Sequence, residues 1–226
     1  MSGVVIGIDV QAARGCPFAV LDTANARIIG SGWMVGNNLA QSVRDLVTRY
    51  PDAVFAIDAP RMPLQTPRSW YWRNGRGWTR GNGAVKGKGR HCEVVIKAHG
   101  LANPQWTPLV GNAPEWMKHG FEIFDALKRR ATTLEVFPSA SYRMLDDVND
   151  VRVNIPLAGF LNGPKDMLDA IVAAVTGVEY LAGRGQEVGG GDGLGTIVLP
   201  RRIAEPITDV MEWPANNHSL GSPDGA

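Results

Sequence analysis

The chain has 226 residues, of which 44% are hydrophobic and 20% charged, and its formal net charge is +1. Length and composition fit one large globular domain with a substantial core, and a net charge this small excludes nucleic-acid binding through overall charge. The two cysteines form neither a metal-ligand pattern nor a disulfide framework. The sequence has no signal peptide and no apolar run long enough for a bilayer, so we expect a cytoplasmic protein outside the membrane.

The N-terminal part of the sequence predicts a sheet with one crossover helix. Apolar, β-branched runs predict strands, the first of them buried on both faces, at residues 4–10, 18–21, 26–35 and 54–57. The short connections between the first three favour an antiparallel meander. Asn38 is expected to cap a helix that ends at Pro51. This order predicts a mixed sheet in which Asp9 and Asp58 end neighbouring strands.

A long segment after the fourth strand, residues 61–113, is rich in glycine, proline, arginine and tryptophan and shows little periodicity. We interpret it as a basic and aromatic insertion, because loops of this length are usually functional or disordered. Basic side chains neutralise phosphates and aromatic rings stack on unpaired bases. The predicted substrate-binding residues are Trp70, Trp72, Arg73, Arg76, Arg80 and Arg90. The alternative is a solvated loop whose tryptophans pack on the domain.

Regular structure is expected to return after this segment. Pro114 is well placed to begin a helix, residues 132–137 predict a strand that contains Glu135, and Ser139 is expected to cap a short helix through Leu145. The last elements are a nearly all-apolar helix over 164–182 and a strand over 195–199. We therefore expect one domain over residues 1–204 and a poorly ordered tail over 205–226.

Two aspartates, Asp166 and Asp169, lie three residues apart in the last predicted helix, so both carboxylates share its narrow polar strip. Interaction with the helix dipole is the alternative explanation for either one. A turn at a strand end explains Asp9 or Asp58 alone, and an edge or solvent-facing position explains Glu135. Acids at two strand ends and on one helix strip together favour a metal site.

The ordered series of motifs resembles the ribonuclease H-like superfamily, and within it an uncharacterised bacterial family of predicted nucleases. The helix with two aspartates is similar to that of Holliday-junction resolvases of the same superfamily. The motifs span most of the chain and are Gly7-Ile8-Asp9-Val10, Ala56-Ile57-Asp58-Ala59-Pro60, Glu135-Val136-Phe137-Pro138-Ser139, Asp166-Met167-Leu168-Asp169-Ala170, Gly195-Thr196-Ile197-Val198-Leu199-Pro200 and, more loosely, Arg90-His91-Cys92-Glu93.

The resemblance implies an α/β fold, a ribonuclease H-like mixed sheet flanked by helices, and hydrolysis of phosphodiester bonds by a two-metal mechanism. It implies that Asp9, Asp58, Asp166 and Asp169 bind Mg²⁺ or Mn²⁺, ions that prefer oxygen ligands. Glu135 joins them as a candidate catalytic residue, although simpler members of the superfamily need no acid on that strand. Nucleic acid is the partner that this activity implies.

Two other classes of function remain open from the sequence. A non-catalytic nucleic-acid-binding module would keep the basic segment and use its acids only for structure. A sugar-kinase-like or actin-like ATP phosphotransferase shares the core fold but needs glycine-rich phosphate hairpins. Residues 11–15 make a poor hairpin of that kind, and the chain is too short for the usual duplication of the fold.

Overall fold

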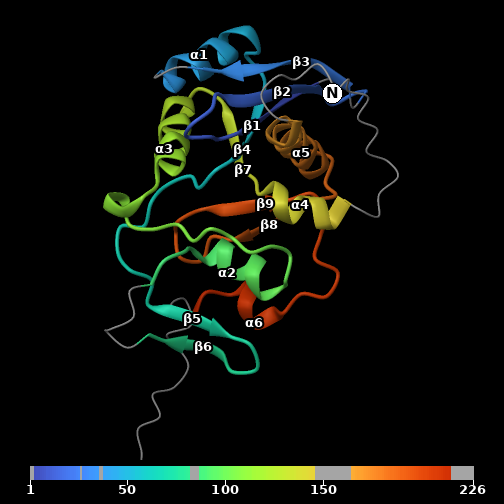
Figure 1. Ribbon diagram of the computed structural model, residues 1–226. Coiled ribbons are helices and arrows are strands. Elements are labelled where there is room, and N and C mark those ends of the chain that lie inside the picture. Colours follow the sequence, from blue (N-terminus) through green and yellow to red (C-terminus); the bar gives the residue numbers. More distant parts are fainter. Residues whose placement is uncertain (1–2, 26, 36–37, 82–86, 146–163, 215–226) are drawn as a thin grey trace, which may run out of the picture.

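The computed structural model describes the chain except for residues 1–2, 26, 36–37, 82–86, 146–163 and 215–226 (Figure 1). Its centre is a five-stranded mixed sheet with the order β3-β2-β1-β4-β7. The strands are β1 (Val4–Asp9), β2 (Cys16–Asp22), β3 (Arg27–Met34), β4 (Val54–Asp58) and β7 (Thr132–Glu135). β1, β2 and β3 form an antiparallel meander, and β4 and β7 continue the sheet parallel to β1. The predicted mixed sheet is thereby confirmed.

Helices cover both faces of this sheet (Figure 1). α1 (Leu39–Arg49) and α3 (Glu115–Leu127) pack on one face, and α5 (Pro164–Leu181) packs on the other, where α4 (Pro138–Leu145) adjoins it. The Asn38 side chain caps α1 as expected and accepts a hydrogen bond of 3.0 Å from the backbone N–H of Gln41. The chain is thus a mixed α/β protein with helices on either side of one sheet.

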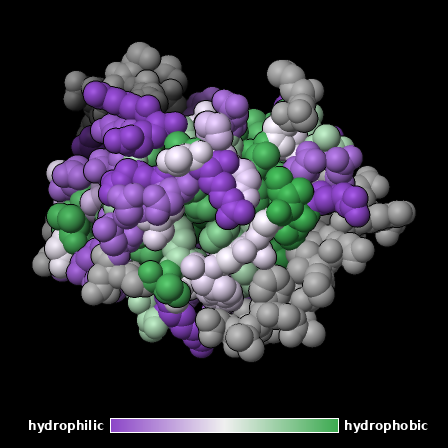
Figure 2. All heavy atoms as spheres, turned by 90° about the horizontal axis from the view of Figure 1, so that it is seen from above, coloured by the Kyte–Doolittle hydropathy of each residue, from purple (hydrophilic) through white to green (hydrophobic). Residues whose placement is uncertain are grey.

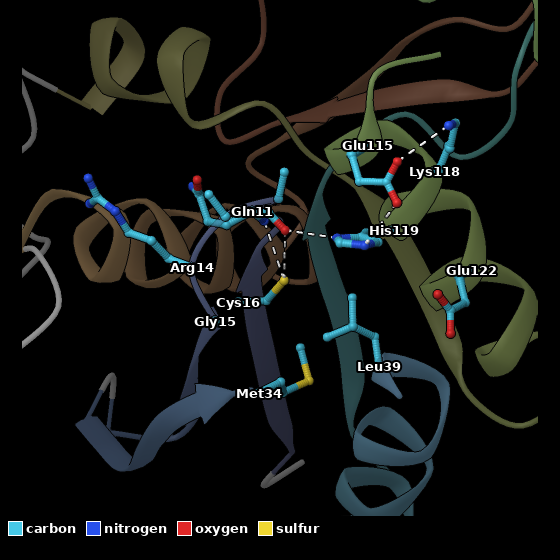
Figure 3. A pocket seen from close by; sticks show the side chains of 12 residues that line it. Gln11, Arg14, Gly15, Cys16, Met34, Leu39, Glu115, Lys118, His119 and Glu122 are labelled. Carbon is cyan, nitrogen blue, oxygen red and sulfur yellow. Dashed lines mark hydrogen bonds and ion pairs between the residues drawn. The ribbon is translucent and has the colours of Figure 1, made fainter. Parts of the chain in front are cut away.

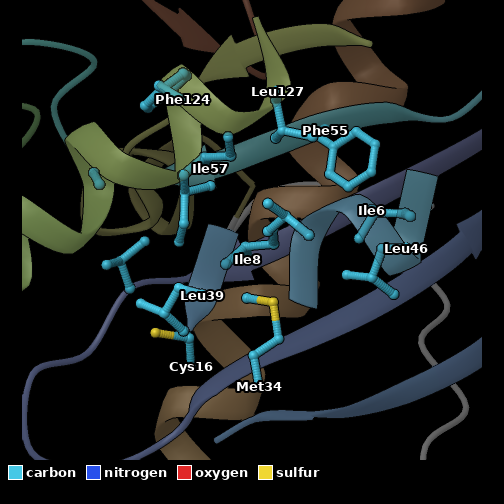
Figure 4. Packing of buried hydrophobic residues seen from close by; sticks show 14 of the residues in the cluster. Ile6, Ile8, Cys16, Met34, Leu39, Leu46, Phe55, Ile57, Phe124 and Leu127 are labelled. Carbon is cyan, nitrogen blue, oxygen red and sulfur yellow. The ribbon is translucent and has the colours of Figure 1, made fainter. Parts of the chain in front are cut away.

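The core on the α1 and α3 side is built from alternate residues of the central strands. Ile6 and Ile8 of β1 lie beside Phe55 and Ile57 of β4, and all four side chains are fully buried (Figure 4). Leu39 and Leu46 of α1 and Leu127 of α3 close this layer. Since side chains alternate between the faces of a strand, the intervening residues of β1 and β4 face α5.

The segment over 61–113 is more ordered than the sequence predicted. It contains a two-stranded hairpin of β5 (Trp70–Arg73) and β6 (Gly77–Arg80), the helix α2 (His91–Ala98) and the short 3₁₀ helix η1 (Val110–Asn112). The expectation of a loop without secondary structure was wrong for α2, because its apolar run packs against a second hairpin. That hairpin joins β8 (Gln186–Gly189), which the sequence did not predict, to β9 (Thr196–Leu199).

Part of the segment predicted to be a poorly ordered tail is ordered. Residues 205–214 lie within the described structure and include α6 (Thr208–Met211). Val210 and Trp213 are buried, and the Trp78 ring packs against Trp213 with 5.1 Å between ring centroids. His91 Nδ1 accepts from the N–H of Gly191, so its Nε2–H donates to the Val210 carbonyl. These contacts hold α6 against α2, and only residues 215–226 of the predicted tail lie outside the described residues.

The outer surface near α1 is strongly polar. Figure 2 looks down on this end and shows hydrophilic side chains gathered on the left, the side on which α1 lies in Figure 1. α1 buries Leu39, Val43 and Leu46 toward the sheet and leaves its other residues partly or fully exposed. Among the described residues, no helix combines the length and apolar character needed to cross a bilayer.

Candidate active site

Two carboxylates meet at the C-terminal ends of adjacent parallel strands. Asp9 of β1 and Asp58 of β4 are register partners, as their positions at the ends of neighbouring strands predicted. Side chains alternate between the faces of a strand, so both carboxylates point to the side on which Ala56 packs against α5. Asp9 is almost completely buried, with 4% of its surface exposed. This pair is the core of the candidate site.

The loss of hydration shifts the ionisation of both strand acids. Burial raises the pKa of Asp9 from 3.8 to about 7, against a hydrogen bond from Gln11 that lowers it, and the charges of Asp169 and Asp166 raise it further. Burial also raises the pKa of Asp58 well above its usual range, and Asp9 and Asp169 add to that shift. Two acids that repel each other in a buried place favour either a proton or a bound cation.

The helix acids act on Asp9 from the first turns of α5. Asp169 lies on that helix and accepts a 3.0 Å hydrogen bond from the Tyr142 hydroxyl. It also forms an ion pair with Lys165 Nζ at 2.5 Å. Asp166 pairs with Arg14 Nη1 at 3.2 Å. Each helix acid therefore has a cationic partner. Asp58, by contrast, accepts no hydrogen bond from any residue in the described part of the chain.

Gln11 connects Asp9 to the largest cavity beside the site. Its Nε2 donates a 2.6 Å hydrogen bond to Asp9 Oδ2, while its backbone carbonyl accepts from His119 Nδ1 at 2.9 Å (Figure 3). The backbone N–H of Gln11 contacts Cys16 Sγ at 3.3 Å, and burial raises the pKa of that thiol to about 11. Gln11 is thus fixed on three sides, and the cavity of about 500 Å³ in front of it is also lined by Arg14 and Lys118.

Glu135 lies on the other face of the sheet from the strand acids, although its charge raises the pKa of Asp58 and both residues line one small cavity. It is the register partner of Ile57, so it faces the α3 side of the sheet, opposite to Asp9 and Asp58. Both of its carboxylate oxygens accept hydrogen bonds from the guanidinium of Arg90, one of them at 2.8 Å. The backbone N–H of Arg61 donates to the same carboxylate at 2.9 Å. This geometry gives Glu135 a structural role and does not support its predicted catalytic role.

Arg90, one of the predicted substrate-binding residues, is buried and ion-paired in the structure. Only 1% of its surface is exposed, and its guanidinium lies between Glu135 and Glu93, with Nη2 at 3.1 Å from Glu93 Oε1. Glu93 also accepts hydrogen bonds from the backbone and hydroxyl of Thr107. Burial alone would lower the pKa of Arg90, but the carboxylates of Glu135 and Glu93 raise it. A guanidinium saturated by two buried carboxylates is not available to a phosphate.

The other predicted substrate-binding residues lie on the β5–β6 hairpin, which Figure 1 places at the opposite end of the molecule from α1. Arg73, Arg76 and Arg80 are exposed, and the Arg80 guanidinium lies 5.2 Å from the centre of the Trp70 ring. Trp72 meets Trp78 edge-on at 5.6 Å. The hairpin therefore presents basic side chains to solvent, but it is not adjacent to the strand acids.

The donor set of the acid cluster suits a hard divalent cation. Carboxylate oxygens are the ligands such ions prefer. Burial raises the pKa of Asp9 and of Asp58 more than the charge of Lys165 lowers it. Within the described ranges, however, no three acidic, histidine or cysteine side chains are grouped closely enough to hold a metal ion. In this arrangement Lys165 and Arg14 hold the helix acids. A third carboxylate could join Asp9 and Asp58 around a cation only if one of these ion pairs were released.

Sequence reasoning missed Gln11, Tyr142 and Lys165. Lys165 and Asp169 are four residues apart in a helix, and this spacing predicts an ion pair. No pattern in the neighbouring sequence predicts the contacts of Gln11 or Tyr142. No protein-family model, curated protein or solved structure matches this chain. Its function is therefore inferred from the geometry of the site.

Proposed function

We propose that this protein is a metal-dependent hydrolase of phosphodiester bonds in nucleic acid, built on a ribonuclease H-like fold. The observation that carries the proposal is the register pair of Asp9 and Asp58, two carboxylates with raised pKa values on the sheet face that α5 covers. A purely structural pair of acids would be costly at this position, since neither carboxylate has a cationic partner among the described residues. The antiparallel meander followed by parallel strands supports the fold.

Asp9 and Asp58 would hold the divalent cation, with Asp169 as the next ligand. A bound Mg²⁺ or Mn²⁺ would lower the pKa of a water molecule and stabilise the leaving oxygen of the phosphodiester. Asp9 must lose its proton to act as a ligand, and a pKa of about 7 makes that loss easy at neutral pH. Asp166 and Asp169 lie close enough to Asp9 to influence its ionisation, so they belong to the same site.

Other residues would position these ligands. Gln11 holds Oδ2 of Asp9 at 2.6 Å and leaves Oδ1 free for a ligand role. Tyr142 fixes Oδ1 of Asp169, while Lys165 holds Oδ2. The Lys165 side chain is 77% exposed, so its ion pair contributes little stability and can open easily. Lys165 would then be free to contact a phosphate of the substrate.

Nucleic acid as the substrate is supported by the β5–β6 hairpin. Arg73, Arg76 and Arg80 are exposed there and carry the positive charge that a protein of net charge +1 lacks overall. Such side chains bind phosphates without regard to sequence. Since the hairpin lies far from β1, the strand that ends in Asp9, in Figure 1, a substrate that touches both must extend along the molecule.

Cleavage of labelled oligonucleotides tests this function. The wild type and Asp9→Asn would be incubated with single-stranded, duplex and branched substrates in Mg²⁺, in Mn²⁺ and in EDTA. We expect metal-dependent cleavage by the wild type and a loss of about 100-fold or more in Asp9→Asn. Asp52→Asn is the matched control, because Asp52 is an exposed acid in the turn before β4. No cleavage by the wild type on any substrate would refute the proposal.

A non-catalytic nucleic-acid-binding protein is the second candidate. It is favoured by one observation: Arg14 and Lys165 already neutralise both helix acids. In that case Asp9→Asn would bind oligonucleotides as the wild type does, and neither protein would cleave them. Binding that is equal with Mg²⁺ and with EDTA, together with no cleavage, would establish this alternative.

A further inference from the structure

A second cavity lies between the β5–β6 hairpin and helix α2, apart from the acid cluster. Its volume is about 350 Å³, and its walls include three aromatic side chains, Tyr71, Trp72 and Trp106. Val94 and Lys97 contribute from α2. All three aromatic residues are only partly buried, so their rings are accessible to a ligand. Aromatic walls of this kind suit a flat, unsaturated ring.

Arg68 lies in the wall of this cavity without an anionic partner. Its guanidinium carbon is 5.0 Å from the centre of the Tyr71 ring and 5.2 Å from that of Trp106, so it is held between two aromatic faces. Nε and Nη1 are shielded from solvent and have no hydrogen-bond acceptor among the described residues. Burial lowers the pKa of Arg68. The third guanidinium nitrogen, Nη2, is not shielded in this way, so it is the atom that can donate to a ligand in the cavity.

The charge around Arg68 also favours an anion. Two carboxylates, Glu93 and Asp192, act on the charge of Arg68. Both already accept hydrogen bonds from other residues, Glu93 from Arg90 and Thr107, and Asp192 from the backbone N–H groups of His91 and Leu194. Lys97 stands exposed at the cavity, where its Nζ donates a 2.7 Å hydrogen bond to Asn103. The cavity lining thus contains two cations and no carboxylate. A ligand that combines an aromatic ring with an anion matches this lining on both counts.

We propose that this cavity binds one unpaired nucleotide of a single-stranded nucleic acid. The base would stack on Trp106 or Trp72, and the adjoining phosphate would accept hydrogen bonds from Arg68 and an ion pair from Lys97. The inference rests on the proposed function only in taking nucleic acid as the ligand. It adds that the substrate is single-stranded at the point of contact, because a base within a duplex cannot reach such walls.

Binding in the absence of divalent cations tests the cavity separately from catalysis. Ten-nucleotide fluorescein-labelled DNA and RNA strands would be titrated in EDTA, and their anisotropy followed, with the wild type, Trp106→Leu, Arg68→Met and Lys97→Met. Loss of one stacked base is expected to weaken binding of Trp106→Leu about 5- to 150-fold. Because Arg68 and Lys97 would share one phosphate, the double variant Arg68→Met/Lys97→Met should reduce the log–log salt slope by roughly 0.7, the value for one phosphate on a single strand, and each single variant by part of that amount.

Two variants away from the cavity serve as matched controls. Trp33→Leu removes a half-buried tryptophan on β3, and Arg44→Met removes a partly exposed positive charge on α1. Both should bind the strands like the wild type. Lys97→Met keeps the test valid if another cavity variant fails to fold, because Lys97 is exposed and its replacement disturbs no core packing. An unlabelled duplex of the same sequence should compete poorly with the labelled strand.

The inference would be overturned if the wild type bound no single strand, or if all three cavity variants bound as tightly as the wild type with the same salt slope. Equal competition by the duplex would also overturn it. Because the titration is done in EDTA, it can succeed even when no cleavage is found. Failure of the proposed hydrolysis would instead appear as the absence of metal-dependent cleavage by a protein that still binds the strand.

Discussion

Gly7 lies directly against Ala170, and this contact sets the distance between β1 and α5. A Cβ atom built on Gly7 would stand 1.9 Å from the carbonyl oxygen of Ala170 and 2.5 Å from the backbone nitrogen of Ala174. The helix can therefore approach the strand only because residue 7 has no side chain. Asp169 immediately precedes Ala170 and Asp9 follows Gly7 by two residues, so the same contact brings the helix acids to the strand acids.

Gly7→Ala is accordingly expected to lower the free energy of unfolding by roughly 3 kcal/mol, at the upper end of overpacking effects, because both clashing atoms are backbone atoms that cannot rotate away. Urea unfolding followed by circular dichroism measures this. Gly111→Ala is the matched control, since a Cβ there meets nothing within 4 Å. A loss below about 1 kcal/mol in Gly7→Ala would show that α5 is not packed on β1 as described.

The raised pKa of Asp9 predicts how stability depends on pH without metal. The folded state holds the Asp9 proton up to about pH 7, whereas the unfolded chain releases it near pH 3.8. Between these values the folded state binds more protons, so the wild type loses stability as pH rises. Asp9→Asn cannot titrate. The stability of Asp9→Asn minus that of the wild type should therefore increase from pH 4 to pH 8, by up to about 4 kcal/mol.

This difference would be measured by urea unfolding in EDTA at each pH, with Asp52→Asn as the control for loss of one negative charge at an exposed position. The asparagine can still accept the hydrogen bond that Gln11 donates to Asp9, so the variant keeps its main local contact. A difference that stays flat across this range, or that falls as pH rises, would mean that Asp9 is not buried as an unpaired acid.

The pairing of Asp9 with Asp58 was predictable, because both acids end strands that were expected to be neighbours in the sheet, and the C-terminal ends of parallel strands lie at the same edge. The helix acids followed from their spacing of three residues. Gln11 was not predictable, since its role depends on where one side chain points beyond the end of β1. The same is true of Tyr142, which reaches Asp169 across 27 positions of sequence.

Arg90 shows why the basic segment was misread. In the sequence Arg90 is the last of a series of arginines and lysines, and such a series is usually exposed to solvent, so Arg90 was expected to be exposed as well. Its partner Glu135 lies 45 positions away, and no local pattern links the two. One signal was present: Glu93 three residues later, before an apolar run, marks the start of a helix. That signal would have found α2, although not the burial of Arg90.

The paired burial of Arg90 and Glu135 predicts a large stability effect. Glu135→Gln removes one of two carboxylates around a guanidinium that is 1% exposed, and breaking a buried ion pair typically costs about 3–5 kcal/mol. Since Glu93 remains, we expect the lower end of that range. A double-mutant cycle with Arg90→Met, followed by urea unfolding, should give a coupling energy above about 1 kcal/mol. Additive effects would contradict the described pairing.

The most direct test of the central claim is calorimetric titration of the metal-free protein with Mn²⁺ at pH 6 in two buffers of different ionisation enthalpy. Asp9 is mostly protonated at this pH, because its pKa is about 7, so the ion must displace that proton to bind. We predict that the wild type binds Mn²⁺ with release of about one proton or more, and that Asp9→Asn does not bind it. A wild type that binds no Mn²⁺, or an Asp9→Asn variant that binds it with the same affinity and proton release, would contradict the claim that Asp9 and Asp58 form a metal site.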